Sequence, residues 1–270
     1  MSARPGPGAT ALRWTGGVLG AVALVAGGLR TADHLARNDT TTTHSYAAAG
    51  SVELVTDGDV TVTTGGTAVE VVARARTGLT AATYAVDEVD EGEGRLEIHH
   101  ECTGVLDDTC TASLEVRVPE GARVTVRSAA GDVSVADVVG DVTVSTNTGA
   151  VTVTEVGGSV TAATGAGDVE VSRVGGSAEV TTSVGAVTVR DVHGDAVVDG
   201  GAGDLDVGGV LGDVRATTSN GRVVVRSSGG PVALDIASAK GRSTVDAPTD
   251  PGASRSVYIR SGNGDVSYVE

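Results

Sequence analysis

Hydrophobic and polar residues alternate along most of the chain, and from residue 131 the alternation repeats in a unit of eighteen residues. Each unit opens on a glycine, and a second glycine lies nine residues later. The two glycine series are Gly131, Gly149, Gly167, Gly185, Gly203 and Gly221, and Gly140, Gly158, Gly176, Gly194, Gly212 and Gly230. Alternation with a period of two predicts short strands with one buried face, and a fixed short repeat predicts stacked structural units.

Five positions of the unit carry aliphatic side chains in nearly every copy, and Ser228 is the one departure. In the unit that begins at Gly167 they are Val169, Val171, Val174, Ala178 and Val180. Half a unit is long enough for one strand and a turn, so each unit predicts one coil, with the next coil about 4.8 Å above it through parallel hydrogen bonds. The sequence therefore predicts an all-β fold, a parallel β-solenoid with 18-residue two-strand coils.

Large aromatic side chains are nearly absent, since aromatic residues make up 2% of the chain and phenylalanine does not occur. Two facing sheets lie about 10 Å apart. Valine and alanine fill that space, whereas a phenylalanine in every coil would force the sheets apart. The composition thus agrees with a thin two-sheet coil.

The segments on either side of the repeat have other patterns. Short alternating stretches with irregular spacing precede it, and we expect them to cover the first coil, whose open edge would otherwise aggregate. After Gly230 the register slips, and the stretches SVYIR and GDVSYVE are expected to close the far end. The expected organisation is a cytoplasmic tail at 1–10, a transmembrane or signal-anchor helix at 11–30, a linker at 31–50, an irregular β cap with a disulfide at 51–127, the regular β-solenoid at 128–238 and a C-terminal β cap at 239–270.

An uncharged stretch of sixteen residues, WTGGVLGAVALVAGGL, lies between Arg13 and Arg30. A helix of this length spans about 24 Å and the bilayer core is about 30 Å thick, so Ala11 and Leu12 are needed to extend it. An uncleaved anchor is favoured over a cleaved signal peptide, because no small-residue cleavage site follows promptly. We expect a single N-terminal anchor in the cell membrane, with the rest of the chain outside the cytoplasm. The alternative is secretion after cleavage.

Two cysteines, Cys102 and Cys110, lie eight residues apart between the alternating stretches LEIHH and SLEVRV. Two strands joined by a short loop bring such thiols together, and an oxidising compartment joins them, so a disulfide is predicted. The alternative is a metal site that includes His99 and His100. Adjacent strand residues point to opposite faces, which argues against both rings binding one ion.

The formal net charge is −16, and the sequence has no basic patch with interleaved aromatic residues. Such a surface repels phosphate backbones, so nucleic acid is not an expected partner. Acidity also keeps a β-rich chain soluble. No catalytic centre and no cofactor are predicted: the pair Asp107–Asp108 is interpreted as a turn, and His193 as an exposed residue between two glycine turns.

The nine-residue half-unit also occurs in calcium-binding β-rolls, which require Gly-Gly-x-Gly-x-Asp. The nearest match is GGAGDLDV at 200–207, where Leu205 stands at the required aspartate position. A calcium-binding roll is therefore kept only as an alternative, and no metal site is predicted. Four carboxylates remain as candidates for a loose cation patch, namely Asp199, Asp204, Asp206 and Asp213.

A further column lies fifteen residues after the opening glycine and contains Thr146, Thr164, Thr182 and Thr218. By the alternation these side chains point inward near a corner, where their hydroxyls can bond along the ladder. Ice-binding solenoids display regular threonine rows on the outside, whereas the outward columns here mix threonine with charged residues. The column is interpreted as structural.

The passage SLEVRVPEGARVTVRSAAGDVSVADVVGDVTVSTNTGAVTV at 113–153 resembles the toast-rack family of bacterial envelope domains, which are also described as adhesins. In that family a strand ending in Val-Pro-x-Gly leads into coils with the pattern Ser/Thr-x-x-Gly-Asp-Val-x-Val. The matching residues here are Val118, Pro119, Glu120, Gly121, Gly131, Asp132 and Val133. The resemblance covers roughly residues 45–270 and implies an envelope-associated, generally non-enzymatic solenoid.

The leading hypothesis is a membrane-tethered extracytoplasmic β-solenoid that acts as a structural, adhesive or envelope-sensing interaction module without catalysis. Its expected partner is an envelope protein or a cell-wall polymer. An enzyme that acts on polysaccharide is the alternative, because parallel β-helices also host such activity. That chemistry requires paired carboxylates and commonly aromatic platforms for sugar rings. Outside the anchor, the tyrosine and tryptophan residues are Tyr46, Tyr84, Tyr258 and Tyr268.

Overall fold

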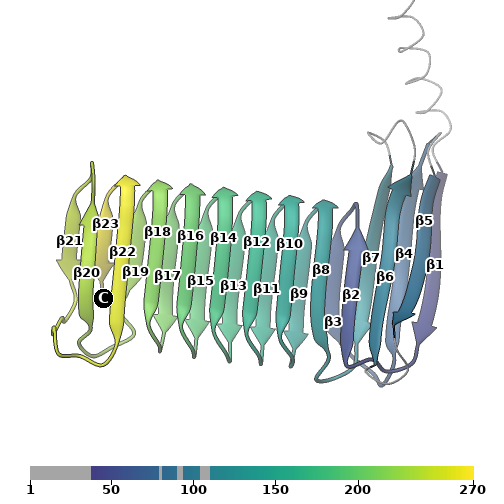
Figure 1. Cartoon of the computed structure of the whole chain (residues 1–270), viewed down its shortest axis with the longest axis horizontal. Helices are drawn as coiled ribbons and strands as arrows, with labels where there is room; N and C mark the ends of the chain where they lie inside the picture. Colours follow the sequence, from purple (N-terminus) through teal and green to yellow (C-terminus); the bar gives the residue numbers. More distant parts are fainter. Residues whose placement is uncertain (1–37, 79–80, 90–93, 104–109) are drawn as a thin grey trace, which may run out of the picture.

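The computed structural model describes residues 38–78, 81–89, 94–103 and 110–270. Its strands stack side by side into a rod that consists of two facing sheets (Figure 1). The expected cytoplasmic tail and membrane helix lie outside the described residues, as does the Asp107–Asp108 pair. Within the described part of the chain, no helix is long and apolar enough to cross a membrane.

Each sheet contains strands from the whole described chain, and the spatial order differs from the chain order at both ends. The 12-stranded sheet has the order β1 (Asn38–Tyr46), β4 (Val69–Thr77), β7 (Thr111–Val118), β3 (Val60–Thr64), β9 (Val133–Val138), β11 (Val151–Val156), β13 (Val169–Val174), β15 (Val187–Val192), β17 (Leu205–Val210), β19 (Val223–Arg226), β23 (Val266–Val269) and β21 (Ser243–Asp246). The 11-stranded sheet has the order β20 (Ala233–Ser238), β22 (Ser256–Asn263), β18 (Val214–Asn220), β16 (Ala196–Ala202), β14 (Ala178–Val184), β12 (Val160–Ala166), β10 (Val142–Thr148), β8 (Arg123–Ala130), β2 (Ser51–Thr56), β6 (Arg95–Thr103) and β5 (Ala81–Val89).

Successive repeat units pair in parallel and in register. Val151 in β11 pairs with Val133 on one side and with Val169 on the other, so residues eighteen apart in sequence lie directly above one another. The facing sheet repeats the same step. The prediction of a parallel β-solenoid is therefore confirmed, and each sequence column is a physical column of the rod.

The aliphatic columns point into the space between the two sheets and are buried along the repeat. Val171 and Val189, near the middle of the rod, are completely buried. Removing such apolar surface from water is the main favourable term that holds the coils together. Ser228 breaks its column, and β19 ends at Arg226, whereas β17 continues through Val210, the equivalent of Ser228. The strand thus ends before the position that lacks an aliphatic side chain.

The coil formed by β2 and β3 lies between two coils that come later in the chain. β2 pairs in parallel with both β6 and β8, and β3 pairs in parallel with both β7 and β9. The parallel stack therefore includes strands of the segment 51–127, beside the antiparallel strands β4 and β5 of the same segment.

At the far end of the rod, which is formed by β20 to β23, the spatial order of the strands again differs from their order in the chain. The expectation that SVYIR and GDVSYVE close this end is wrong, because β22 and β23 lie inside β20 and β21 (Figure 1). The inner pair contributes the buried side chains of Val257, Ile259, Val266 and Tyr268. The outer pair contributes aliphatic side chains that are only partly buried. The strands with the larger apolar content thus take the place that is covered on both sides.

The near end of the rod is closed by antiparallel strands, and the outermost of them in one sheet, β1, lies in the segment 31–50 that was expected to be a linker. β1 pairs with β4, β4 with β7, and β5 with β6. The Tyr46 and Tyr84 hydroxyls lie 2.8 Å apart, and the His44 ring stacks on Tyr84 with 4.3 Å between centroids. Aromatic side chains with polar atoms therefore cover this end of the hydrophobic core.

The corner glycines stack so closely that no side chain fits between coils. A Cβ atom on Gly167 would lie 1.9 Å from the carbonyl oxygen of Gly149, and the φ angle of Gly167 is +154°. This conformation is essentially restricted to glycine. The glycines of the first series, from Gly131 to Gly221, therefore mark the places where one coil touches the next through backbone alone, whereas Gly230 of the second series has open space at its Cβ position.

The inward threonine column is buried, as predicted, and its hydroxyls bond to the corner backbone. Thr164 donates to the carbonyl of Gly149 at 3.3 Å, and Thr218 donates to the carbonyl of Gly203 at 3.4 Å. Each bond joins the two sides of one corner within a single coil, so the hydroxyls do not form a ladder among themselves. They satisfy carbonyl groups that would otherwise be buried without a partner.

Candidate functional site

The disulfide is present as predicted. Cys102 lies in β6 and Cys110 immediately precedes β7, with their Cα atoms 6.0 Å apart. The two neighbouring histidines have separate surroundings: His99 Nε2 lies 2.9 Å from Glu97 Oε1, whereas His100 is buried and donates from Nδ1 to the carbonyl of Ser113 at 3.3 Å. The structure therefore does not bring both imidazole rings to one ion.

The four carboxylates of the cation-patch hypothesis are not brought together. Asp199 lies on β16 and Asp206 on β17, in opposite sheets, whereas Asp204 and Asp213 lie at the corners before β17 and β18. Their partners are Thr217 for Asp199, Arg222 for Asp204, Arg190 and Arg226 for Asp206, and the Ser256 amide for Asp213. Across residues 38–270, as far as they are described, no three His, Cys, Asp or Glu side chains are placed to hold a metal ion.

Corner carboxylates instead bind the backbone of the next coil. The amide of the residue eighteen positions later donates to each of them at 2.8 Å, in the pairs Asp132 with Ala150, Asp168 with Ala186, and Asp204 with Arg222. The alternation of aspartate with alanine in this column keeps like charges two coils apart, which limits their repulsion. These carboxylates stabilise the stack and are not available as a free acidic row.

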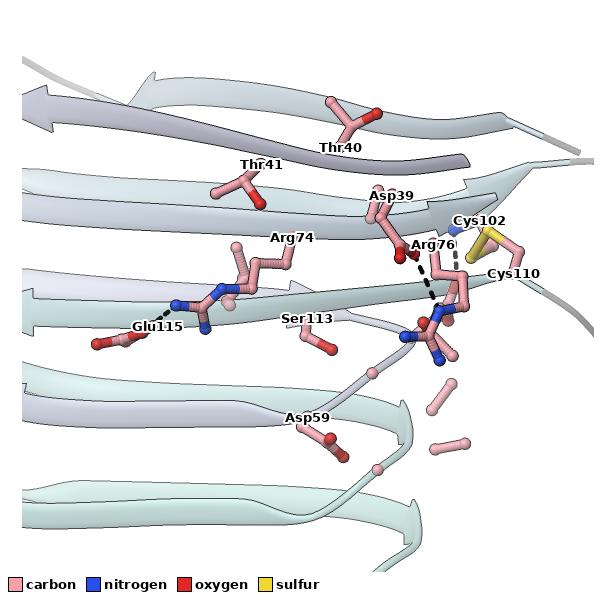
Figure 2. Close-up of a pocket in the computed structure, with 18 of the residues that line it drawn as sticks. Asp39, Thr40, Thr41, Asp59, Arg74, Arg76, Cys102, Cys110, Ser113 and Glu115 are labelled. Atoms are coloured by element: carbon pink, nitrogen blue, oxygen red, sulfur yellow. Dashed lines mark hydrogen bonds and ion pairs between the residues drawn. A yellow bond between two sulfur atoms is a disulfide. The ribbon is translucent and has the colours of Figure 1, made fainter. Parts of the chain in front are cut away.

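An open groove of about 1000 Å³ lies near the cap (Figure 2). Strands β1, β4 and β7 supply most of its lining, and the turn before β3 and the disulfide complete it. On β7 the alternation buries Leu114 in the core and leaves Ser113 and Glu115 on the groove side. The groove thus lies on the outer surface of the 12-stranded sheet.

Two ion pairs cross the groove wall. Arg74 on β4 reaches Glu115 on β7 at 2.9 Å, and Arg76 reaches Asp39 on β1 at 3.0 Å (Figure 2). Asp59 lies on the neighbouring turn and accepts the Asp132 amide at 2.9 Å. All four ion-pairing side chains are more than one-third exposed, so they remain accessible to a partner while their charges are balanced.

Sequence reasoning did not find this groove. Its lining comes from β1, β4 and β7, which are far apart in sequence and outside the repeat. The pairing of β7 between β4 and β3 is what places these residues on one surface. The sequence pattern of each strand gives its exposed face but not its neighbours, so no local signal could have predicted the groove.

A second, smaller hollow of about 260 Å³ lies between the two sheets at the cap end of the rod. Thr40, Thr42, Tyr84 and His100 are among the residues that line it. Burial raises the pKa of Tyr84, and the hydrogen bond with Tyr46 adds to this effect. Burial also lowers the pKa of His100, although the Ser113 carbonyl and the Asp57 charge oppose the shift.

The lowered pKa of His100 predicts that acid destabilises the cap. The unfolded chain takes up a proton at the ordinary histidine pKa of 6.5, whereas the folded chain does so only at lower pH. The contribution of neutral His100 to the stability of the fold is therefore fully present above pH 6.5 and is lost as the pH falls below that value. We expect urea unfolding between pH 7.5 and about 5 to show falling stability, with a smaller slope in His100→Gln. An unchanged slope in that variant would contradict the assignment to His100.

A cluster of one tyrosine and two arginines lies on the outer face of the 11-stranded sheet near the far end of the rod. The Tyr258 ring lies between two guanidinium groups, with Arg215 at 4.4 Å and Arg260 at 4.3 Å from its centroid. Arg260 also pairs with Asp235 at 2.7 Å. These contacts join β18, β22 and β20 across the outer surface, so the cluster has a structural role in holding the last coils.

The fold and the groove together define a rod-shaped, two-sheet parallel β-solenoid with an antiparallel cap. The family model for Toastrack DUF4097 matches residues 106–270. The chain belongs to this family, as the resemblance in the repeat indicated.

Several solved structures are similar to this chain at low sequence identity. A candidate adhesin from Parabacteroides distasonis ATCC 8503 is 14% identical, with 85% of this chain and 97% of that chain covered and a TM-score of 0.47. A candidate adhesin from Bacteroides fragilis NCTC 9343 is 12% identical, with 86% and 97% covered and a TM-score of 0.41. A candidate lipid-binding protein from Parabacteroides distasonis ATCC 8503 is 12% identical, with 86% and 97% covered and a TM-score of 0.39. The comparison with curated proteins found no match.

Proposed function

We propose that this chain is a non-catalytic interaction module of the cell envelope, held outside the cytoplasm by an N-terminal membrane anchor. The groove at the cap end carries the proposal. It is an open hollow of about 1000 Å³ on the outer surface of the sheet, and its lining includes two balanced ion pairs and exposed threonine hydroxyls. Exposed charges and hydroxyls in such a hollow are available to bind the main chain and charged groups of an extended segment.

The lining of the groove favours a protein segment as the partner. Arg74, Arg76, Asp39 and Glu115 offer charges of both signs, which suit a peptide that carries its own charged groups. Among the described lining residues there is no aromatic side chain on which a sugar ring could stack. An envelope protein therefore fits the groove better than a cell-wall polymer does. The test below distinguishes these two classes of partner.

The engagement of the groove carboxylates supports a role without catalysis. Of the four carboxylates that line the groove, Asp39 and Glu115 each bind an arginine, and Asp57 and Asp59 accept backbone amides. A glycosidase needs one carboxyl group as an acid and a second as a base or nucleophile. The corner aspartates are occupied by backbone amides. The Cys102–Cys110 disulfide supports an oxidising compartment, in agreement with export.

The test compares two charge-reversal variants of the full chain in cells. Arg74→Glu with Arg76→Glu changes the groove, whereas Arg173→Glu changes an equally exposed arginine that pairs with Glu155 at 2.9 Å on the side of the rod. Cross-linking in intact cells followed by mass spectrometry of the membrane fraction is expected to recover an envelope protein with the unaltered chain and with Arg173→Glu. The groove variant is expected to lose that protein.

Three results would overturn the proposal. Recovery of the same partner with the groove variant would show that binding occurs elsewhere. Co-purification of wall polymer without a protein would identify the other partner class. Release of reducing sugars by the purified chain, lost on substitution of Asp39 or Glu115, would make the chain an enzyme.

A further inference from the structure

Both sheets end in edge strands at each end of the rod, which are β1 and β5 at the cap end and β21 and β20 at the far end. At the far end β20 and β21 each pair with one strand only, β22 and β23 respectively (Figure 1). A single bridge, from Val232 to Thr249, covers the start of the outer edge of β20. The rest of both outer edges presents backbone N–H and C=O groups that no described strand pairs, which is a template for another strand.

Three inward side chains at this end are apolar and incompletely covered, although Ser238 and Ser243 also face inward. Leu234 and Ile236 on β20 are half-buried, although their neighbours on β22 are buried. Val245 on β21 points inward beside Tyr268 but is 48% exposed. The hydrophobic core of the rod is therefore open to water here.

The cap end differs on one of its two edge strands, β1, whereas Val86 on the other, β5, is also only partly buried. Inward positions of its edge strand β1 include Thr40 and Thr42, and Tyr46 with Tyr84 closes the core behind them. Polar side chains thus face water where the stack ends in β1. Val245, at 48% exposed, makes the far end the better candidate for a further layer.

The outward side chains of β21 indicate what that layer is. Arg242 immediately precedes β21 and Asp246 is its last residue, so they lie two residues before and two residues after the outward Thr244. The Arg242 side chain is 87% exposed although it contacts Asp265 at 3.1 Å. Asp246 is exposed and has no ion pair among the described residues. The edge therefore carries one positive and one negative group at symmetric positions.

Such a strand is complementary to itself. Antiparallel pairing with a second copy must place inward side chains opposite inward side chains. The register centred on Thr244 meets this condition, and it also places Arg242 opposite Asp246 of the second copy at both ends of the pair. It brings Val245 beside the inward Ser243 of the other chain and covers its exposed surface.

We infer that the far end of the rod binds the same end of a second copy of this chain. β21 pairs with β21 about a two-fold axis, and β20 pairs with β20 on the opposite sheet, so that the two cores become continuous. The cap ends then point away from each other at the extremes of a doubled rod. Self-association of this surface requires neither the membrane anchor nor a partner in the groove.

A single introduced thiol tests the pairing. In the full chain, purified in mild detergent, Thr244→Cys is expected to form a disulfide-linked dimer on mild oxidation, because directly opposed residues have Cβ atoms about 5 Å apart. The native cysteines are already joined to each other. The matched control is Ser267→Cys, one strand further in, where the two thiols would be about 14 Å apart and are expected to stay unlinked.

Charge exchange provides an independent measurement. Sedimentation velocity is expected to show a dimer for the unaltered full chain and a monomer for Asp246→Arg or Arg242→Asp, each checked for folding by circular dichroism. The double variant, Arg242→Asp with Asp246→Arg, is expected to recover the dimer. A monomeric unaltered chain, a dimer that Asp246→Arg leaves intact, or cross-linking of Ser267→Cys equal to that of Thr244→Cys would each overturn the inference. Loss of the envelope partner in the groove variant leaves this result unchanged, so the two proposals fail separately.

Discussion

Substitution of Gly167 by alanine is expected to destabilise the rod by about 4 kcal/mol, because the new side chain both strains the backbone and overpacks the corner. Its Cβ atom would lie 1.9 Å from the Gly149 oxygen, in backbone that has coils above and below it and cannot move aside. Urea unfolding followed by circular dichroism measures the loss as a lower midpoint.

Gly66→Ala is the matched control for this substitution. Gly66 also has a positive φ, +76°, but no atom lies within 4 Å of the place where its Cβ would be. Only the strain of the left-handed conformation is then expected, about 1 kcal/mol. Equal losses in the two variants would show that close stacking of the coils is not what requires glycine at the corners.

Val171→Phe is the second large effect, expected to cost about 3 kcal/mol through overpacking. Val171 is completely buried, and it pairs with Val153 and Val189 in its own sheet, so the larger ring has no space along the rod or across it. A thermal or urea unfolding curve gives the change in the free energy of unfolding. This cost is our physical account of a repeat without phenylalanine, whereas the coil next to the open end accommodates Tyr268 in the same column.

The open end provides the comparison for Val171→Phe. Val245 occupies an equivalent inward position but is 48% exposed, so Val245→Phe can extend beyond the last coil. We expect a change within about 0.5 kcal/mol, as for substitutions outside the packed core. A large loss at Val245 together with a small loss at Val171 would contradict a core whose width is limited only where coils lie on both sides.

The repeat was predictable from the sequence because each of its coils is a local unit. Glycine spacing gave the corners, alternation gave the inward columns, and a constant step of eighteen gave the register that Val133, Val151 and Val169 adopt. The disulfide was also predictable, since Cys102 and Cys110 flank one short loop. In these cases the residues that decide the structure are close in sequence.

The order of coils at the two ends was not predictable in the same way. Nothing within β2 and β3 shows that they insert between β6–β7 and β8–β9, because all these strands have similar alternation. The same holds for β22 and β23, which we placed at the end of the rod. The groove depends on the first of these insertions, so its residues could not be grouped from the sequence. Which of several similar strands takes a position covered on both sides depends on the packing of the whole stack, not on the strand itself.

Distances between spin labels along one outer column test the stack most directly. Labels at Thr61 paired with Thr188, Val224 or Ser267 join β3 to strands four, six and seven places further along the 12-stranded sheet. A spacing of about 4.8 Å per strand predicts about 19, 29 and 34 Å between the labelled backbone positions. Double electron–electron resonance measures such distances in the folded chain. Distances that increase in this order by these steps agree with the solenoid described above, whereas a Thr61–Val224 distance no longer than the Thr61–Thr188 distance would contradict it.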